Sequence, residues 1–373
     1  MSELDTLRHH IDEIDDSILD LLEIRMKVTD EIGKFKKANA VSIMQKDREH
    51  HLKERLKNKS THPILKEKIA SIFQLIMETS KLSMSIQNAP ECPFDHVGIL
   101  GFGIMGGSIA KALKVKKTNI KISTLKRDSA DIKSALDSKT IDVVYDSIAD
   151  LAQNNDLIVV ATPIDTVDNI CKKIHSTISK KKLIVIDIAS VKEEITKRFQ
   201  EYTNDTIEFL PTHPMAGSEH SGFTDSTAGL FINRPWIICP HTKTNERTQN
   251  QVTEFIKSLG SNPIIMNAKQ HDESVAKVSH LVFLISTYLF AYSQNDPEAM
   301  KLAGTGFESI TRLASGNASM HAQIFEKNSK NIETELEKFI DYMLHNKLTT
   351  QSAASFFEKN KMLRDEFIKK TTK

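Results

Sequence analysis

Three side chains that could transfer protons or bind anions lie in or just after short apolar segments of the sequence. Ser190 follows LIVIDIA, His213 follows EFL, and Arg312 lies in GFESITRLA. A histidine exchanges protons near neutral pH, a hydroxyl can orient it, and an arginine can bind a carboxylate through two hydrogen bonds. Ligands of open α/β sheets bind at the carboxyl ends of the strands, so these residues could form a catalytic site. The competing interpretation is structural, which is the commoner role of a single histidine.

A glycine-rich turn is the clearest binding motif. The predicted strand HVGIL leads into GFGIMGG, and the helix-forming SIAKALK follows. A GxGxxG pattern between a strand and a helix is typical of dinucleotide binding, because the glycines let the backbone approach a pyrophosphate at the helix N-terminus. The predicted cofactor contacts are Gly101, Gly103, Ile104, Met105, Gly106 and, after the apolar run DLIVVA, Thr162.

The residues that follow the second predicted strand bear on the choice between NAD and NADP. An NAD-binding fold usually places an acidic residue about 20 positions after the third glycine, where it binds the ribose hydroxyls. Lys126 and Arg127 occupy that place. Two cations suit a 2′-phosphate, so the sequence favours NADP. The alternative is that both are solvated and Asp128 reaches the ribose, which would leave NAD as the cofactor.

Composition excludes several classes of protein. The 373 residues are 39% hydrophobic and 27% charged, with 50 basic and 49 acidic side chains. These values fit a soluble globular protein of more than one domain, with no basic field for nucleic acid. Three cysteines without a CxxC pair, and a start without an apolar leader, favour the cytoplasm and predict no metal site. The longest apolar run, 278–292, is short for a membrane span and is interpreted as a buried core helix.

The pattern along the chain predicts three domains. Residues 1–88 show helical spacing of apolar side chains, sustained over more than 30 residues from Leu4 to Phe35. Residues 95–267 alternate β-branched runs with helical segments, which predicts a parallel sheet flanked by helices. Residues 268–373 are again helical. The expected fold is therefore an all-helical domain, a Rossmann-like domain and a second helical domain. Long exposed helical seams predict a homodimer.

Arg25 interrupts the first helical seam. A cation on an apolar seam is costly unless it is paired, so Arg25 could mark a buried anion site. Arg8, Lys36, Arg48 and Glu49 could converge on that site if the helices fold back. The alternative is an arginine at the edge of the seam whose charged end reaches water.

Residues 96 to about 345 resemble the prephenate dehydrogenase family. The resemblance rests on GFGIMGGS, DIASVK, HPMAGSEHSG, HDESVAKVSHL and GFESITRLA, in this order. It implies that His213 is the catalytic base, that Ser190 supports the substrate hydroxyl or orients His213, and that Arg312 binds a substrate carboxylate. It further implies that His280 lines the substrate pocket and that Glu219 lies at its edge.

Residues 1 to about 88 resemble the all-helical class of chorismate mutase. The match lies in LDTLRHHIDEIDDSILDLLEIR, IGKFK, DRE and FQLIMETS. The resemblance implies that chorismate is bound by Arg8 of a partner chain and by Arg25, Lys36, Arg48, Glu49 and Ser80. Two positions depart from the family. Met84 stands where the family has Gln or Glu facing the ether oxygen, and Gln45 replaces an aspartate.

Together these features predict a fused enzyme of tyrosine biosynthesis. It would rearrange chorismate to prephenate and then oxidise prephenate with NAD or NADP to 4-hydroxyphenylpyruvate. One alternative is an arogenate dehydrogenase with a degenerate, regulatory mutase-like domain, against which Glu219 argues by resemblance. A second alternative is a dinucleotide-dependent sensor protein, against which the joint presence of His213, Ser190 and Arg312 argues.

Overall fold

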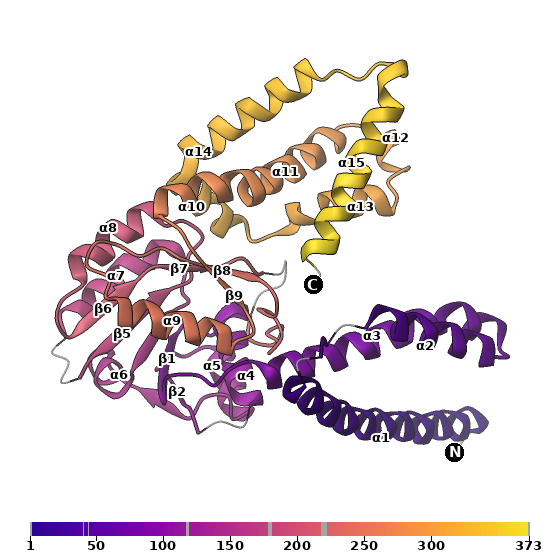
Figure 1. Cartoon of the computed structure of the whole chain (residues 1–373), viewed down its shortest axis with the longest axis horizontal. Helices are drawn as coiled ribbons and strands as arrows, with labels where there is room; N and C mark the ends of the chain where they lie inside the picture. Colours follow the sequence, from indigo (N-terminus) through magenta and orange to yellow (C-terminus); the bar gives the residue numbers. More distant parts are fainter. Residues whose placement is uncertain are drawn as a thin grey trace. The chain divides into compact units, whose positions relative to one another are not determined.

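The computed structural model describes residues 2–39, 41–43, 45–116, 119–177, 181–217 and 222–371. The chain divides into two compact units, residues 1–90 and 91–373 (Figure 1). The first unit is helical, and the second holds a parallel sheet followed by helices. The predicted fold class is confirmed.

The first unit consists of three helices, α1 (Glu3–Ala38), α2 (Lys46–Lys59) and α3 (Pro63–Asn88). Ser2 begins α1 through a capping box with Asp5, and Pro63 begins α3, where its missing N–H costs nothing. Both α1 and α2 pack against α3. Much of the predicted apolar seam nevertheless faces solvent within one chain, because Leu7 and Leu21 are 58% and 66% exposed.

The second unit begins with a six-stranded parallel sheet of order β3-β2-β1-β4-β5-β6. Its strands are β1 (His96–Leu100), β2 (Lys121–Leu125), β3 (Val143–Tyr145), β4 (Leu157–Val160), β5 (Leu183–Asp187) and β6 (Ile207–Leu210). The connecting helices are α4 (Ile104–Val115), α5 (Ala130–Asp137), α6 (Ile148–Asn154), α7 (Ile164–His175) and α8 (Glu193–Tyr202). The central strands are buried on both faces, as their β-branched runs predict.

A second, three-stranded sheet corrects one prediction. The runs RPWIICP and NPIIMN do not extend the parallel sheet. They form β8 (Pro235–Ile238) and β9 (Asn262–Ile265), joined by α9 (Glu246–Ser258). The run EFLPTHP divides at Pro211 into β6 and β7 (Thr212–Pro214), and β7 pairs antiparallel with β8. Proline lacks the N–H of a sheet ladder, so the chain leaves one sheet there and His213 enters the other.

The last part of the second unit is helical. Its elements are α10 (Ala268–Val275), the π-helical turn η1 (Ala276–His280), α11 (Leu281–Ser293), α12 (Pro297–Met300), α13 (Thr305–Thr311), the 3₁₀ turn η2 (Arg312–Ser315), α14 (Ala318–His345) and α15 (Thr350–Thr371). Helices α10 and α11 continue one another through η1, which contacts α14 (Figure 1).

The apolar run within α11 is less buried than the sequence predicts. The continuous helix Ala268–Ser293 is long and apolar enough to cross a membrane by length and composition alone, and 28% of its apolar window is buried within the chain. Tyr288 and Tyr292 are exposed. The prediction of a buried core helix is therefore wrong for a single chain.

Candidate active sites

A line of hydrogen bonds connects His213 to two neighbouring residues of α10. His213 Nδ1 lies 2.8 Å from His271 Nε2, and His271 Nδ1 lies 2.7 Å from Asp272 Oδ1. An ionised carboxylate only accepts hydrogen bonds, so His271 donates from Nδ1, and a neutral His271 ring accepts at Nε2. His213 then donates from its own Nδ1. This arrangement leaves the lone pair on His213 Nε2, where a general base needs it.

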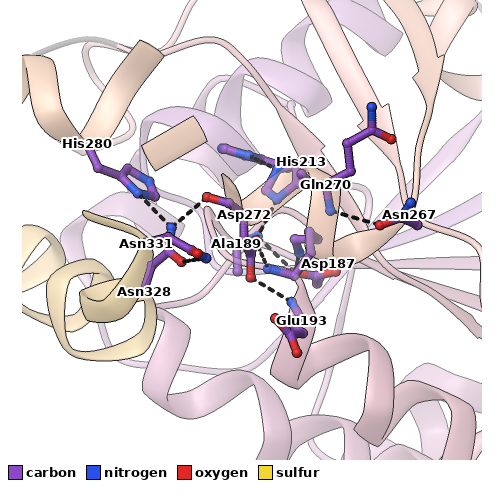
Figure 2. Close-up of polar contacts among 12 residues, drawn as sticks. Asp187, Ala189, Glu193, His213, Asn267, Gln270, Asp272, His280, Asn328 and Asn331 are labelled. Atoms are coloured by element: carbon purple, nitrogen blue, oxygen red, sulfur yellow. Dashed lines mark hydrogen bonds and ion pairs between the residues drawn. The ribbon is translucent and has the colours of Figure 1, made fainter. Parts of the chain in front are cut away.

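Asp272 is held by the beginning of α8. Its Oδ1 accepts the Lys192 backbone N–H at 2.8 Å, and its Oδ2 accepts the Glu193 N–H at 2.9 Å (Figure 2). A carboxylate at a helix N-terminus is stabilised by the helix dipole and by the unpaired N–H groups. Asp272 therefore fixes His271 from a rigid position.

A buried ion pair lies beside His213. Lys192 and Asp187 are both fully buried, and the Lys192 ammonium contacts the Asp187 carboxylate. Asp187 also accepts the backbone N–H of Thr212, the residue before His213, at 3.1 Å. The pair thus connects the end of β5 to β7. Among the described His, Cys, Asp and Glu side chains, no group of three or more is placed to hold a metal ion.

Burial controls the charge state of His213. The side chain is 7% exposed. Burial, followed by the neighbouring His271, Lys192 and His280, lowers the pKa of His213 well below its usual value. Each of these causes disfavours the protonated ring. His213 is therefore neutral near pH 7 and able to accept a proton.

His280 lies at the edge of a largely apolar cavity. Its Nδ1 is 3.2 Å from the amide nitrogen of Asn328, and that amide also donates to the Asp272 carbonyl at 2.9 Å (Figure 2). Helix α14 is kinked at Asn328, whose backbone is non-helical. The buried Nε2 of His280 has no hydrogen-bond partner in the described structure. Burial lowers the pKa of His280 to about 4.

The cavity is large enough for a small aromatic molecule. Its volume is about 310 Å³, and Phe283, Leu284, Thr287 and His321 line it together with His280. An unpaired buried polar atom costs free energy that a bound ligand would recover. His280 is therefore suited to donate a hydrogen bond to a substrate.

The other residues predicted for the dehydrogenase site are Ser190, Arg312 and Glu219. Ser190 is partly buried in the loop after β5, and His271, not Ser190, is the hydrogen-bond partner of His213 Nδ1. Arg312 is exposed at the start of η2, two residues before Ala314 of the cavity wall. Glu219 lies outside the described residues.

The glycine-rich turn fits a dinucleotide. Gly101 has φ +98°, and a Cβ there would lie 2.3 Å from the Ala161 carbonyl oxygen. A Cβ on Gly106 would lie 1.9 Å from the Gly101 carbonyl oxygen, whereas Gly103 faces open space. Gly103 begins α4 without a side-chain cap, which leaves its first N–H groups for an anion. Ile104 and Met105 form the first turn of α4. Thr162 lies just after β4, and its hydroxyl accepts a hydrogen bond from the Thr166 hydroxyl at 2.8 Å.

Lys126 and Arg127 lie at the end of β2, as predicted, and both are exposed. The Lys126 ammonium pairs with Asp146 Oδ1 at 3.1 Å, and both side chains are mostly exposed. Such a surface pair contributes little free energy, so Lys126 can exchange Asp146 for a ligand phosphate. Asp128 is also exposed.

In the first unit, the three helices bring together most of the predicted mutase residues. Arg25 of α1 donates to the hydroxyl of Ser80 of α3. Lys36 of α1 is 9% exposed, and its ammonium donates to the Ile43 carbonyl at 2.8 Å. Burial, then Arg48, lowers the pKa of Lys36, and Glu49 opposes this shift. Glu49 pairs with Lys81, the residue after Ser80, and this links Arg25, Lys36, Arg48, Glu49 and Ser80 into what we call the mutase cluster.

Of the other predicted features, Arg8 lies apart from that cluster, whereas Met84 follows Ser80 by about one turn of α3. Arg8 is exposed near the start of α1 and pairs within its own helix with Asp5 at 3.9 Å. Met84, the departure from the family, is buried, and a Cβ on Gly33 of α1 would lie 2.9 Å from its Cγ. Gln87 reaches Ser83 at 3.5 Å, and the Ser83 hydroxyl donates to Asp30 at 2.8 Å.

Three family models match consecutive parts of the chain. They are chorismate mutase type II over residues 7–84, the nucleotide-binding domain of prephenate dehydrogenase over 109–265, and its dimerization domain over 267–359. The chain belongs to the prephenate dehydrogenase family, with a fused type II chorismate mutase domain. The chain therefore carries both activities of tyrosine biosynthesis, the rearrangement of chorismate to prephenate and the oxidative decarboxylation of prephenate to 4-hydroxyphenylpyruvate.

Individual proteins agree with this assignment. Prephenate dehydrogenase of Lactococcus lactis is 29% identical over 71% of this chain and 75% of its own length. The T-protein of Haemophilus influenzae is 22% identical, over 96% of this chain and 89% of its own length. The crystal structure of prephenate dehydrogenase from A. aeolicus, in complex with hydroxyphenyl propionate and NAD+, superposes with a TM-score of 0.64. It is 28% identical, over 74% of this chain and 98% of that one.

Several candidate residues of the dehydrogenase site are not indicated by sequence spacing. His271 and Asp272 fall in the quoted segment HDESVAKVSHL, yet no spacing rule indicates that they face a histidine 58 positions earlier. Lys192 follows the same predicted strand as Ser190, but its buried ion pair with Asp187 is visible only in the structure. In the mutase unit, the sequence does not single out Lys81, because it is not among the residues that the resemblance to chorismate mutase implies.

Proposed function

We propose that His213 is the general base of the dehydrogenase reaction, and that the His271–Asp272 pair fixes its tautomer. The observation that carries this proposal is the hydrogen-bonded line from His213 through His271 to Asp272. His213 Nε2 accepts the proton of the substrate's ring hydroxyl. A bound nicotinamide dinucleotide supplies the hydride acceptor. Loss of carbon dioxide then makes the ring aromatic, which drives the reaction.

The remaining dehydrogenase residues hold the substrate. Arg312 binds a carboxylate, for which a guanidinium is suited by its two parallel N–H groups. His280 donates from its unpaired Nε2, and its low pKa supports a neutral ring in this role. Ser190 supports the substrate hydroxyl, and Glu219 lies at the edge of the pocket by resemblance.

The mutase unit needs no acid or base, because its reaction exchanges no proton. It acts by holding cationic side chains next to the substrate. We propose that Arg25, Lys36 and Arg48 bind the carboxylates and ether oxygen of chorismate, that Glu49 and Ser80 hold its polar groups, and that Arg8 comes from a partner chain. The exposed position of Arg8 supports the last point. Fixed cations stabilise the charge that develops as the ether bond breaks.

Nicotinamide reduction measured at 340 nm tests the proposed function on the full chain. Prephenate should give a larger kcat/KM than arogenate with either cofactor, and chorismate should be consumed without a cofactor. Faster oxidation of arogenate, together with no mutase activity, would favour an arogenate dehydrogenase with a degenerate mutase domain.

We propose NADP as the preferred cofactor. The exposed Lys126 and Arg127 at the end of β2 support this choice. We expect a higher kcat/KM with NADP than with NAD. Lys126→Glu should lower kcat/KM with NADP by about tenfold, because a hydrogen bond to a charged group contributes about 1.5–3 kcal/mol. A clear preference of the wild type for NAD would contradict the proposal.

We propose a homodimer as the working form. Exposed apolar side chains along α1, such as Leu7 and Leu21, and along α11, such as Tyr288 and Tyr292, would be covered by a second copy. The match to a dimerization domain supports the contact through α11. Light scattering at micromolar concentration should give twice the chain mass of 42.0 kDa, and a monomer would contradict this.

The proposed location is the cytoplasm. Cys92, Cys171 and Cys239 are all unpaired thiols, which supports a reducing compartment. Fractionation of cells that make the protein should recover it with cytoplasmic markers.

A further inference from the structure

An unassigned lysine lies in the mutase cluster. Lys81 of α3 places its ammonium 3.1 Å and 3.3 Å from the two carboxylate oxygens of Glu49 of α2. The side chains are only 22% and 19% exposed. A lysine and a glutamate seldom lose this much solvent without a reason in the site or the packing.

The surroundings of Lys81 come from all three helices. Helix α1 contributes Arg25 and Lys36, helix α2 contributes Arg48 and Glu49, and helix α3 contributes Ser80. Counted with Lys81, this set has four cations and one carboxylate, and Lys81 contacts that carboxylate directly. Such an excess of positive charge is unfavourable in the empty site and suits a substrate with two carboxylates and an oxygen that becomes negative.

The neighbouring positions of α3 offer no better donor. Met84 has no N–H or O–H group and packs against Gly33. Ser80 already accepts from Arg25 and donates to the Ile76 carbonyl at 2.9 Å. Gln87 lies at Ser83, beside Asp30. Lys81 and Met84 are three residues apart, so they share one side of the helix.

We propose that Lys81 supplies the positive charge at the breaking ether bond of chorismate, in place of the side chain at position 84. This inference rests on the proposed mutase roles of Glu49 and the other cluster residues. The flexible four-carbon stem of Lys81 lets its ammonium move from Glu49 to the ether oxygen. Glu49 then turns to the substrate hydroxyl. The carbon–oxygen bond breaks and a carbon–carbon bond forms within the same molecule. Lys81 keeps its proton throughout.

Kinetics of the full chain with chorismate test this assignment. Lys81→Met should lower the mutase kcat by about 10²-fold, as expected for loss of one donor to developing charge, with KM changed by less than about threefold. The dehydrogenase kcat with supplied prephenate should stay at the wild-type value, which verifies folding of the second unit, and the helical circular dichroism of the full chain, to which residues 1–90 contribute, should match the wild type. Lys53→Met is the matched control, because Lys53 also joins α2 to α3, through Gln74 at 3.2 Å. It should leave the mutase kcat unchanged.

A double variant separates a chemical role from a positioning role. Adding Met84→Gln to Lys81→Met restores a donor on the same side of α3 and should recover at least about tenfold of the lost kcat. No recovery, or equal losses in Lys81→Met and Lys53→Met, would overturn the assignment of Lys81. A wild-type chain without mutase activity would instead overturn the proposed mutase roles as a whole.

Discussion

His213→Asn should lower the kcat for oxidation of prephenate by a factor on the order of 10² to 10⁴. Asparagine can keep a hydrogen bond to His271 but cannot take the hydroxyl proton near pH 7. The buried position of His213 and its contact with His271 are otherwise preserved. Binding of prephenate should change little. Steady-state kinetics at 340 nm with saturating cofactor give both parameters.

Arg312→Ala is the comparison variant for this experiment. Its main effect should be a higher KM for prephenate, because Arg312 is proposed to bind a carboxylate in the ground state as well as in the transition state. The two variants thus distinguish a residue that acts in the chemical step, which changes kcat, from a residue that binds prephenate, which changes KM. A His213→Asn enzyme with nearly normal kcat would refute the role of His213, whatever Arg312→Ala shows.

The pH profile gives a second test of His213. A base works when it is neutral, and the pKa of His213 is held well below 6.5 by burial and by neighbouring His271, Lys192 and His280. The wild-type kcat/KM should therefore stay level as pH falls through 6.5 and decline only at lower pH. A decline centred near 6.5 would show that the base is a solvent-exposed group of ordinary pKa.

The sequence was sufficient to predict the elements that have strong local signals. The 36-residue helix α1 follows from an apolar seam that Arg25 interrupts once. The turn at Gly101 follows from the glycine spacing alone, and the structure shows why, since a Cβ at Gly101 or Gly106 would collide with the backbone. The resemblance to chorismate mutase implies Arg8 and the residues of the mutase cluster together, whereas the structure places Arg8 apart from that cluster.

Features that depend on the meeting of distant segments could not be predicted. The break at Pro211 looks like the end of a strand, but only pairing with β8 sends His213 into a second sheet. The kink at Asn328 has no sequence signal, and the Asn328 side-chain amide meets the Asp272 carbonyl, 56 positions away, only in the folded chain. Met84 was recognised as a departure from the family, whereas the cation beside it became visible only through Glu49.

His271→Leu should lower the kcat for prephenate by about 10²-fold, because a misplaced or wrongly protonated base loses its near-attack geometry. Leucine fills the fully buried position of His271 but offers no acceptor to His213 Nδ1. The His213 ring is then free to carry its proton on Nε2, where it cannot act as a base. KM should change by less than about threefold, since His271 is proposed to act through His213 and not on the substrate.

His271→Gln separates this positioning role from a packing role. Its amide oxygen can accept from His213 Nδ1 as the imidazole does, so most of the lost kcat should return. Asp272 keeps the backbone N–H groups of Lys192 and Glu193 in both variants, so the start of α8 and the melting temperature should be similar in the two. Equal loss of kcat in His271→Leu and His271→Gln would mean that the ring only fills space. Recovery in the glutamine variant alone would tie catalysis to the hydrogen bond that sets the tautomer of His213.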